Sequence, residues 1–134
     1  MPKKSKKQGV KYDGGKPRIS LLPGLAIEQV MLVAEFGAKK YGDDNYRLGM
    51  PVTRFINAAY RHIFKEWLFY GRDLDIDPNC PKCQKNNCST NPDIKQRDHS
   101  GLPHLAHGAW NILAALEQML LKPQFDDRWK NKEK

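Results

Sequence analysis

Apolar side chains recur with helical spacing in three long segments of this chain. In the first, predicted to run from about Leu25 to Lys40, one helical face carries Ile27, Val30, Met31, Ala34 and Ala38. In the second, about Val52 to Tyr70, the stripe is Ile56, Ala59, Tyr60, Ile63, Trp67 and Tyr70, and Gly71 follows where a helix end favours glycine. The third follows Ser100, a predicted N-cap, stops at Lys122-Pro123, and presents Leu105, Ala109, Ile112, Leu116 and Met119. The pattern predicts an all-α fold of three main helices.

The second predicted helix is apolar on nearly all sides. Outside its stripe it also carries Phe55, Phe64, Leu68 and Phe69. A helix of this kind is buried on several sides. Because three helices in one chain cannot cover it, we expect a homo-oligomer.

The segments around these helices divide the chain. Residues 1–9 are a basic arm that we expect to be disordered, and residues 123–134 are a charged tail of the same kind. Residues 10 to 23 contain two adjacent glycines and two prolines, which indicates an ordered strap without helix. Residues 72 to 99 are polar and loop-like. The length of 134 residues fits one domain, which we place at 10–122.

Composition limits the expected cellular location and the class of partner. No apolar run approaches the roughly 20 residues that span a bilayer, and the charged N-terminus lacks the apolar stretch of a secretory signal. We therefore expect a soluble cytoplasmic protein. The net charge of +8 comes largely from the two ends and favours polyanionic partners, either nucleic acid or free nucleotides. Charge alone does not choose between them.

Three cysteines lie in the polar loop. Cys80 and Cys83 form a CxxC, Cys88 follows, and His99 closes the segment. An odd number of thiols in a reducing compartment is not a disulfide framework, whereas CxxC supplies two of the four donors of a structural Zn²⁺ site. Cys88 would be the third ligand and His99 the fourth, with His104 or a partner chain as alternatives. Free thiols and a redox CxxC are the other interpretations.

Opposite the apolar faces, the helices carry polar groups that could converge. The first helix offers Glu28, Glu35 and Lys39, the second His62 and Glu66, the third His104, His107 and Asn111, and the loop between them Asp73, Asp75 and Asp77. Each set has an ordinary explanation as surface ion pairs or structural histidines. Together they suit a phosphorylated ligand with a hard divalent cation, because Mg²⁺ binds carboxylates and phosphates while Lys and Arg neutralise the remaining charge.

Five blocks of sequence carry a family resemblance. They are KYDGGKPRISLLP, EFGAKKYGDDNYRLG, the Arg61-His62 pair, GRDLD and SGLPHLAHGAWN, in order over roughly residues 10 to 121. The chain resembles the phage dATP/dGTP diphosphohydrolases, a MazG-like branch of the all-α nucleoside triphosphate pyrophosphohydrolases, and within it the MazZ-type enzymes. The resemblance implies a MazG-like helical bundle, assembled as a dimer or tetramer.

The resemblance also implies an activity and a ligand set. The expected reaction is Mg²⁺- or Mn²⁺-dependent cleavage of a purine deoxynucleoside triphosphate, dGTP or dATP, between the α and β phosphates. In the MazZ-type case the dGMP product feeds synthesis of a 2-aminoadenine nucleotide. The implied metal ligands are Glu35, Glu66, Asp73 and Asp77, the first three also being catalytic. The implied substrate-binding residues are Lys16, Arg18, Lys39, Lys40, Asn45, Arg61, His104, His107 and Asn111.

Two features depart from the family pattern. His104-x-x-His107 stands where ordinary MazG-like enzymes carry carboxylates, and the cysteine loop, residues 78–99, looks like an insertion. We expect the two histidines to face the nucleotide site, with the core, an oligomer interface or zinc ligation as alternatives. The rival function is a zinc-containing nucleic-acid-binding protein, although the helix carboxylates argue against direct nucleic-acid binding.

Overall fold

The computed structural model describes residues 7–77, 79–81 and 99–130, and its regular elements are helical. The long helices are α1 (Gly24–Tyr41), α2 (Val52–Tyr60), η3 (Arg61–Phe69) and α4 (His104–Leu121). Short 3-10 turns are η1 (Ile19–Leu21), η2 (Asn45–Leu48) and η5 (Pro123–Phe125). In the described residues the extended pairing is a single bridge between Leu74 and Pro103. The all-α prediction is confirmed.

Local sequence explains where α1 begins and ends. Pro23 precedes its first residue, and the fixed φ of proline suits this position. Gly42 follows its last residue with a φ of +94°, a conformation that favours glycine, and its N–H donates to the Ala38 carbonyl over 2.7 Å. The predicted bounds of this helix are therefore correct to within a residue.

The second predicted helix is continuous over residues 52 to 69 but changes its winding at Arg61. α2 is α-helical, whereas η3 is π-helical, so that the Tyr70 N–H donates to the carbonyl of Lys65, five residues earlier. Gly71 follows with a φ of +64°, as predicted for the helix end. π-helical turns are rare and often occur at functional sites.

The prediction that Ser100 caps the third helix is wrong. α4 begins four residues later, at His104, and its N-cap is Pro103 without a side-chain hydrogen bond. The Ser100 side chain accepts the Leu102 N–H over 3.1 Å and is buried in contacts with the preceding loop. Ser100 therefore holds the loop in place instead of capping the helix.

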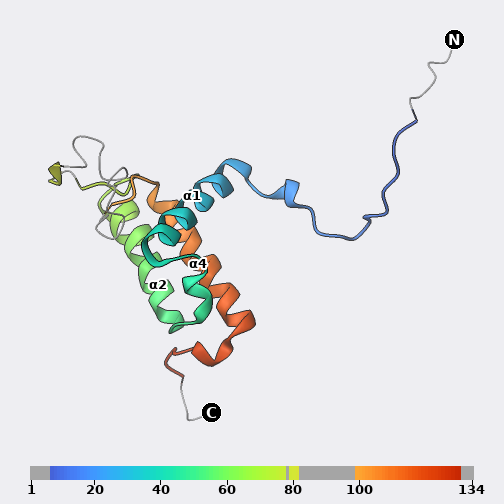
Figure 1. Ribbon diagram of the computed structural model, residues 1–134. Helices are drawn as coiled ribbons and strands as arrows, with labels where there is room; N and C mark the ends of the chain where they lie inside the picture. The colour runs from blue at the N-terminus through green and yellow to red at the C-terminus, as the bar shows by residue number, and fades with distance from the viewer. Residues whose placement is uncertain (1–6, 78, 82–98, 131–134) are drawn as a thin grey trace.

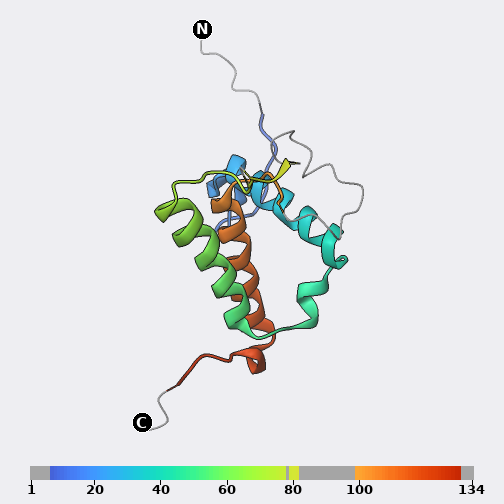
Figure 2. The ribbon, with the colours of Figure 1, turned by 90° about the vertical axis from the view of Figure 1, so that its left-hand side faces the viewer.

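The helix α4 lies at the centre of the fold. It packs against α1, α2 and η3, and Figures 1 and 2 show the continuous α2–η3 helix running antiparallel beside it. The buried core cluster consists of Val52, Phe55, Ala114 and Ala115. Partly buried side chains packed against this cluster are Tyr46, Met50, Trp110, Met119 and Phe125.

The apolar faces predicted from periodicity are not the faces buried within the chain. Of the predicted stripe on the second helix only Ala59 is buried, while Phe55, which lay outside the stripe, is in the core. On α4 the buried face carries Ala106, Gly108, Ala114 and Ala115. The large side chains Leu105, Ile112 and Leu116 are 45%, 44% and 55% exposed. Small residues allow the helices to approach closely, so the large ones are left on the outside.

The C-terminal segment is held against the bundle as far as the structure describes it. The ring of Phe125 packs on the core, and the backbone N–H and Oγ of Thr53 donate to the Asp127 carboxylate. Of the predicted tail, Phe125 thus packs against the bundle, while Pro123, Gln124 and Asp127 are exposed. None of the helices in the described ranges has the length and apolar character that a membrane crossing requires.

Candidate active site

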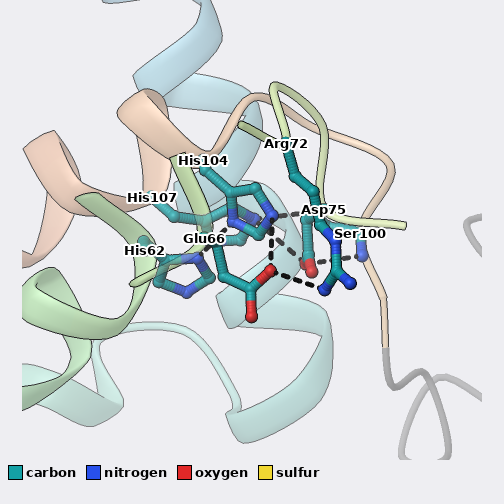
Figure 3. Close-up of polar contacts among 7 residues, drawn as sticks. All are labelled: His62, Glu66, Arg72, Asp75, Ser100, His104 and His107. Atoms are coloured by element: carbon teal, nitrogen blue, oxygen red, sulfur yellow. Dashed lines mark hydrogen bonds and ion pairs between the residues drawn. The ribbon is translucent and has the colours of Figure 1, made fainter. Parts of the chain in front are cut away.

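Three imidazoles gather where η3 meets the start of α4. We call His62, His104 and His107 the histidine cluster (Figure 3). The Nδ1 atoms of His62 and His104 lie 2.8 Å apart, and the rings of His62 and His107 stack with centroids 4.4 Å apart. One Nδ1 must carry a proton and the other must accept it, so the short contact requires at most one charge on this pair.

A serine and an aspartate from the loop hold the third imidazole. The backbone N–H and the Oγ of Ser100 both donate to Oδ2 of Asp75 over 3.0 Å. The same Oγ contacts Nε2 of His107, which lies 3.5 Å from Oδ2 of Asp75. With Nε2 protonated, His107 donates to Ser100 and Ser100 donates to Asp75, so a single line of hydrogen bonds joins α4 to the loop.

A second carboxylate approaches the cluster from η3. The Arg72 guanidinium donates to Oε2 of Glu66 over 3.0 Å, and Nε2 of His104 lies 4.0 Å from the same oxygen (Figure 3). The Arg72 N–H donates to the Glu66 carbonyl, so backbone and side chain fix this pair together. Glu66 is thereby held at the border between the cluster and solvent.

Burial favours the neutral forms of His62 and His107. Desolvation, and then the neighbouring His107 imidazole, lower the pKa of His62 to about 4. Desolvation also lowers the pKa of His107, against the opposing pull of the Asp75 carboxylate. Because His104 and His107 are only 3% and 6% exposed, they contact protein groups in this structure and not a solvent-filled space.

An open hollow of about 470 Å³ lies on the outer face of α1. It is lined by Glu28, Gln29, Met31, Leu32, Ala34 and Glu35. Its two carboxylates come from positions seven residues apart, so they share one side of the helix. Phe36, the next residue after Glu35, turns inward and meets the His107 ring edge-on at 6.2 Å. α1 therefore separates the hollow from the histidine cluster.

The structure distributes the predicted acidic ligands over different places. Glu35 lines the hollow, and Glu66 borders the histidine cluster. The Asp73 carbonyl accepts the His104 N–H, and the Asp77 carboxylate accepts the Asn79 N–H. In the described part of the chain no three His, Cys, Asp or Glu side chains form a group that could hold a metal ion.

The predicted basic and amide groups also differ in their surroundings. Exposed side chains are those of Lys16, Arg18, Lys39 and Arg61. Lys40 is half-buried, with Nζ 5.4 Å from the Tyr41 ring centroid. Asn111 donates to the His107 carbonyl within its own helix, and Asn45 begins η2. Of the predicted zinc ligands, Cys83 and Cys88 lie outside the described residues, so the zinc site stays a prediction.

The site residues expected from the sequence did not include several residues that the structure brings together. Arg72 and Ser100 were not expected at the site, whereas His62, Asp75 and Glu28 were expected among the converging polar groups but without an assigned role. The i, i+7 spacing already places Glu28 beside Glu35. No sequence signal separates Asp75 from Asp73 and Asp77, because a loop closure over 25 residues decides which one meets Ser100.

Comparison with known proteins supports the family resemblance. The chain is 28% identical over 120 residues to a protein of Salmonella phage PMBT28 named dATP/dGTP diphosphohydrolase. That match covers 90% of this chain, which spans about a third of the length of the phage protein (33%). No solved structure matches. The family described as dATP/dGTP diphosphohydrolase, N-terminal, matches residues 6–128. The chain therefore belongs to the N-terminal dATP/dGTP diphosphohydrolase family.

Proposed function

We propose that this chain hydrolyses a purine deoxynucleoside triphosphate to the monophosphate and pyrophosphate. Family membership and the name of the phage relative support the substrate class. The observation that carries the proposal is the hollow on α1, where Glu28 and Glu35 stand on one helix side above an apolar floor of Met31 and Leu32. Such a surface offers oxygen ligands beside apolar side chains on which the flat face of a purine could pack.

The two carboxylates fit the metal that the family implies. In nucleotide sites Mg²⁺ is usually bound through one or two carboxylates and completes its shell with water and substrate phosphates. Glu28 and Glu35 would provide the protein oxygens, and a bound Mg²⁺ or Mn²⁺ would polarise the phosphate and activate a water. Lys39, one helical turn beyond Glu35 and exposed, would neutralise phosphate charge.

The remaining predicted residues take supporting roles in this proposal. Glu66 is a further acidic group, oriented by Arg72, with Asp73 and Asp77 as additional candidates for the metal. The histidine cluster, in which His104 and His107 are buried, would position α1 through the Phe36–His107 contact instead of touching the nucleotide. Preference for dGTP over dATP, and a role of dGMP in 2-aminoadenine nucleotide synthesis, complete the proposal.

We also propose that the working form is a homo-oligomer. Apolar side chains on three elements are exposed, among them Met31 at 61%, Phe69 at 69% and Leu120 at 73%. Large apolar side chains exposed in this number favour an interaction surface. A second copy of the chain would cover it.

The proposed reaction is tested by supplying each of the four deoxynucleoside triphosphates with Mg²⁺ or Mn²⁺ and separating the products. We expect dGTP, and dATP more slowly, to give the monophosphate and pyrophosphate, with loss of turnover when the metal is chelated. Release of inorganic phosphate and a nucleoside diphosphate would show cleavage between the β and γ phosphates and would contradict the proposed reaction. No turnover of any of the four would overturn the proposal and favour the nucleic-acid-binding alternative.

A further inference from the structure

Residues 7–22 extend away from the helices. They include the end of the predicted basic arm and most of the predicted strap, and from here on we call residues 7–22 the arm. Figure 1 shows the arm leaving the N-terminal end of α1 and continuing outward from the bundle. Every residue of the arm is exposed, with Tyr12 at 90%, Ile19 at 80% and Val10 at 79%. An extended segment cannot bury its own side chains, so no described part of the chain covers these apolar groups.

Local features set the course of the arm. The Lys16 N–H closes a turn on the Asp13 carbonyl over 3.0 Å, and η1 adds a second turn. Pro17 and Pro23 restrict the backbone on both sides of η1. These turns and prolines limit the backbone conformations open to the arm, which lowers the entropy lost when it docks.

The hollow on α1 complements the arm in charge and in polarity. The hollow combines the carboxylates of Glu28 and Glu35 with the apolar side chains of Met31 and Leu32. The arm combines cationic and apolar side chains in the same way, namely Lys7, Lys11, Lys16 and Arg18 with Val10, Tyr12 and Ile19. Complementary charge selects the partner, and burial of apolar surface supplies affinity.

We propose that the arm of one copy docks along the α1 hollow of a second copy and brings Lys16 and Arg18 beside Glu28 and Glu35. The role of these two cations toward a triphosphate rests on the proposed function; the docking itself does not. Without nucleotide they pair with the two carboxylates. With nucleotide they neutralise phosphate charge, which makes each active site the product of two chains.

A cross-linking experiment tests the docking independently of any activity. Equal amounts of unlabelled and heavy-isotope-labelled chain are allowed to exchange and are then treated with a carbodiimide, which joins a lysine directly to a carboxylate. We expect mixed-isotope peptides that link Lys16 or Lys11 to Glu28 or Glu35, and their loss in the Lys11→Gln/Lys16→Gln variant. Links within one isotope only, or links from these lysines to other carboxylates only, would overturn the proposal.

A complementation experiment tests the shared site. Glu35→Gln lacks one of the hollow's two carboxylates, and Lys16→Ala/Arg18→Ala lacks two of the arm's cations. We expect a loss in rate of about 100-fold or more for Glu35→Gln and of at least about tenfold for Lys16→Ala/Arg18→Ala, the effect of one or two charge contacts. In a two-fold dimer, mixing them restores one intact site in half of the molecules, roughly a quarter of the wild-type rate. If native mass spectrometry finds mixed oligomers but the rate does not recover, the arm acts on the hollow of its own chain and the proposal is wrong. If wild-type protein releases no pyrophosphate, the proposed function fails, and the cross-links still decide the docking.

Discussion

Ser100 joins three parts of the molecule through one hydroxyl. Its Oγ donates to Asp75, contacts His107 and accepts the Leu102 N–H, and the residue is only 4% exposed. Buried polar groups that lose a partner retain their desolvation penalty. This makes the side chain a sensitive probe of the loop closure that holds the histidine cluster together.

The variant Ser100→Ala should lower the free energy of unfolding by about 1–3 kcal/mol, because Asp75 and His107 each lose a buried partner. Urea unfolding followed by circular dichroism measures the change. Ser20→Ala, in the exposed turn η1, is the matched control and should change stability by less than about 0.5 kcal/mol. Equal effects of the two substitutions would show that the Ser100 hydroxyl does not hold the loop.

The histidine cluster should make stability depend on pH. Burial lowers the pKa of His62 to about 4 from an ordinary value of 6.5, so between these values the unfolded chain binds a proton that the folded chain does not. Stability is then full above pH 6.5 and falls as the pH drops toward 4, by about 1–3 kcal/mol for this residue. Unfolding measured at a series of pH values should show this slope, and His62→Gln should flatten it. An unchanged slope in His62→Gln would remove His62 as its source.

At the scale of elements, the sequence predicted where the helices begin and end better than which side of each helix is buried. Pro23, Gly42 and Gly71 act through backbone geometry, which is local, so the helix ends were readable. Which side of a helix is buried depends on its neighbours. Phe55 lies in the core and Tyr60 is 54% exposed, although periodicity placed Tyr60 and not Phe55 in the apolar stripe. The pairing of Asp75 with Ser100 joins segments 25 residues apart, and no local pattern specifies it or the π-helical winding of η3.

Gly108 permits the close approach of α4 to η3. A Cβ at this position would collide with the Ile63 side chain, so Gly108→Ala should destabilise the fold by about 1–3 kcal/mol. Gly37→Ala is the matched control: it lies in the interior of α1 with open space around its Cβ position and should stabilise by about 0.5–1 kcal/mol. Urea unfolding of both variants checks the opposite signs. Stabilisation by Gly108→Ala would contradict the packing of these two helices.

At the scale of the whole molecule, the described residues of one chain leave much apolar surface uncovered. The π-helical segment η3 contains no buried residue, and Phe64, Leu68 and Phe69 are 47%, 54% and 69% exposed. The second helix was predicted to be apolar on nearly all sides, and within one chain these extra apolar side chains are exposed. A protomer taken alone exposes such apolar surface when an oligomer interface normally buries it.

Sedimentation equilibrium should find the wild-type chain as a dimer or larger. Phe69→Glu places a charge on the exposed face of η3 and should shift the protein toward monomer by at least about tenfold in dissociation constant, because burying an unpaired charge is costly. Lys65→Glu, exposed on the same element, should change assembly much less. A wild-type chain that is monomeric at all concentrations would contradict both the oligomer and the docked arm.

The central claim is that the carboxylates on the outer face of α1 form the centre of a nucleotide hydrolase. The most direct measurement is pyrophosphate release from dGTP with Mg²⁺ by wild-type protein, Glu35→Gln and Glu117→Gln. The last of these is the matched control, because Glu117 lies on α4 near Arg47, and it should retain full activity. We predict a loss of about 100-fold or more in Glu35→Gln with unchanged unfolding, as expected for removing a metal-binding oxygen. Equal rates in wild-type protein and Glu35→Gln would contradict the account.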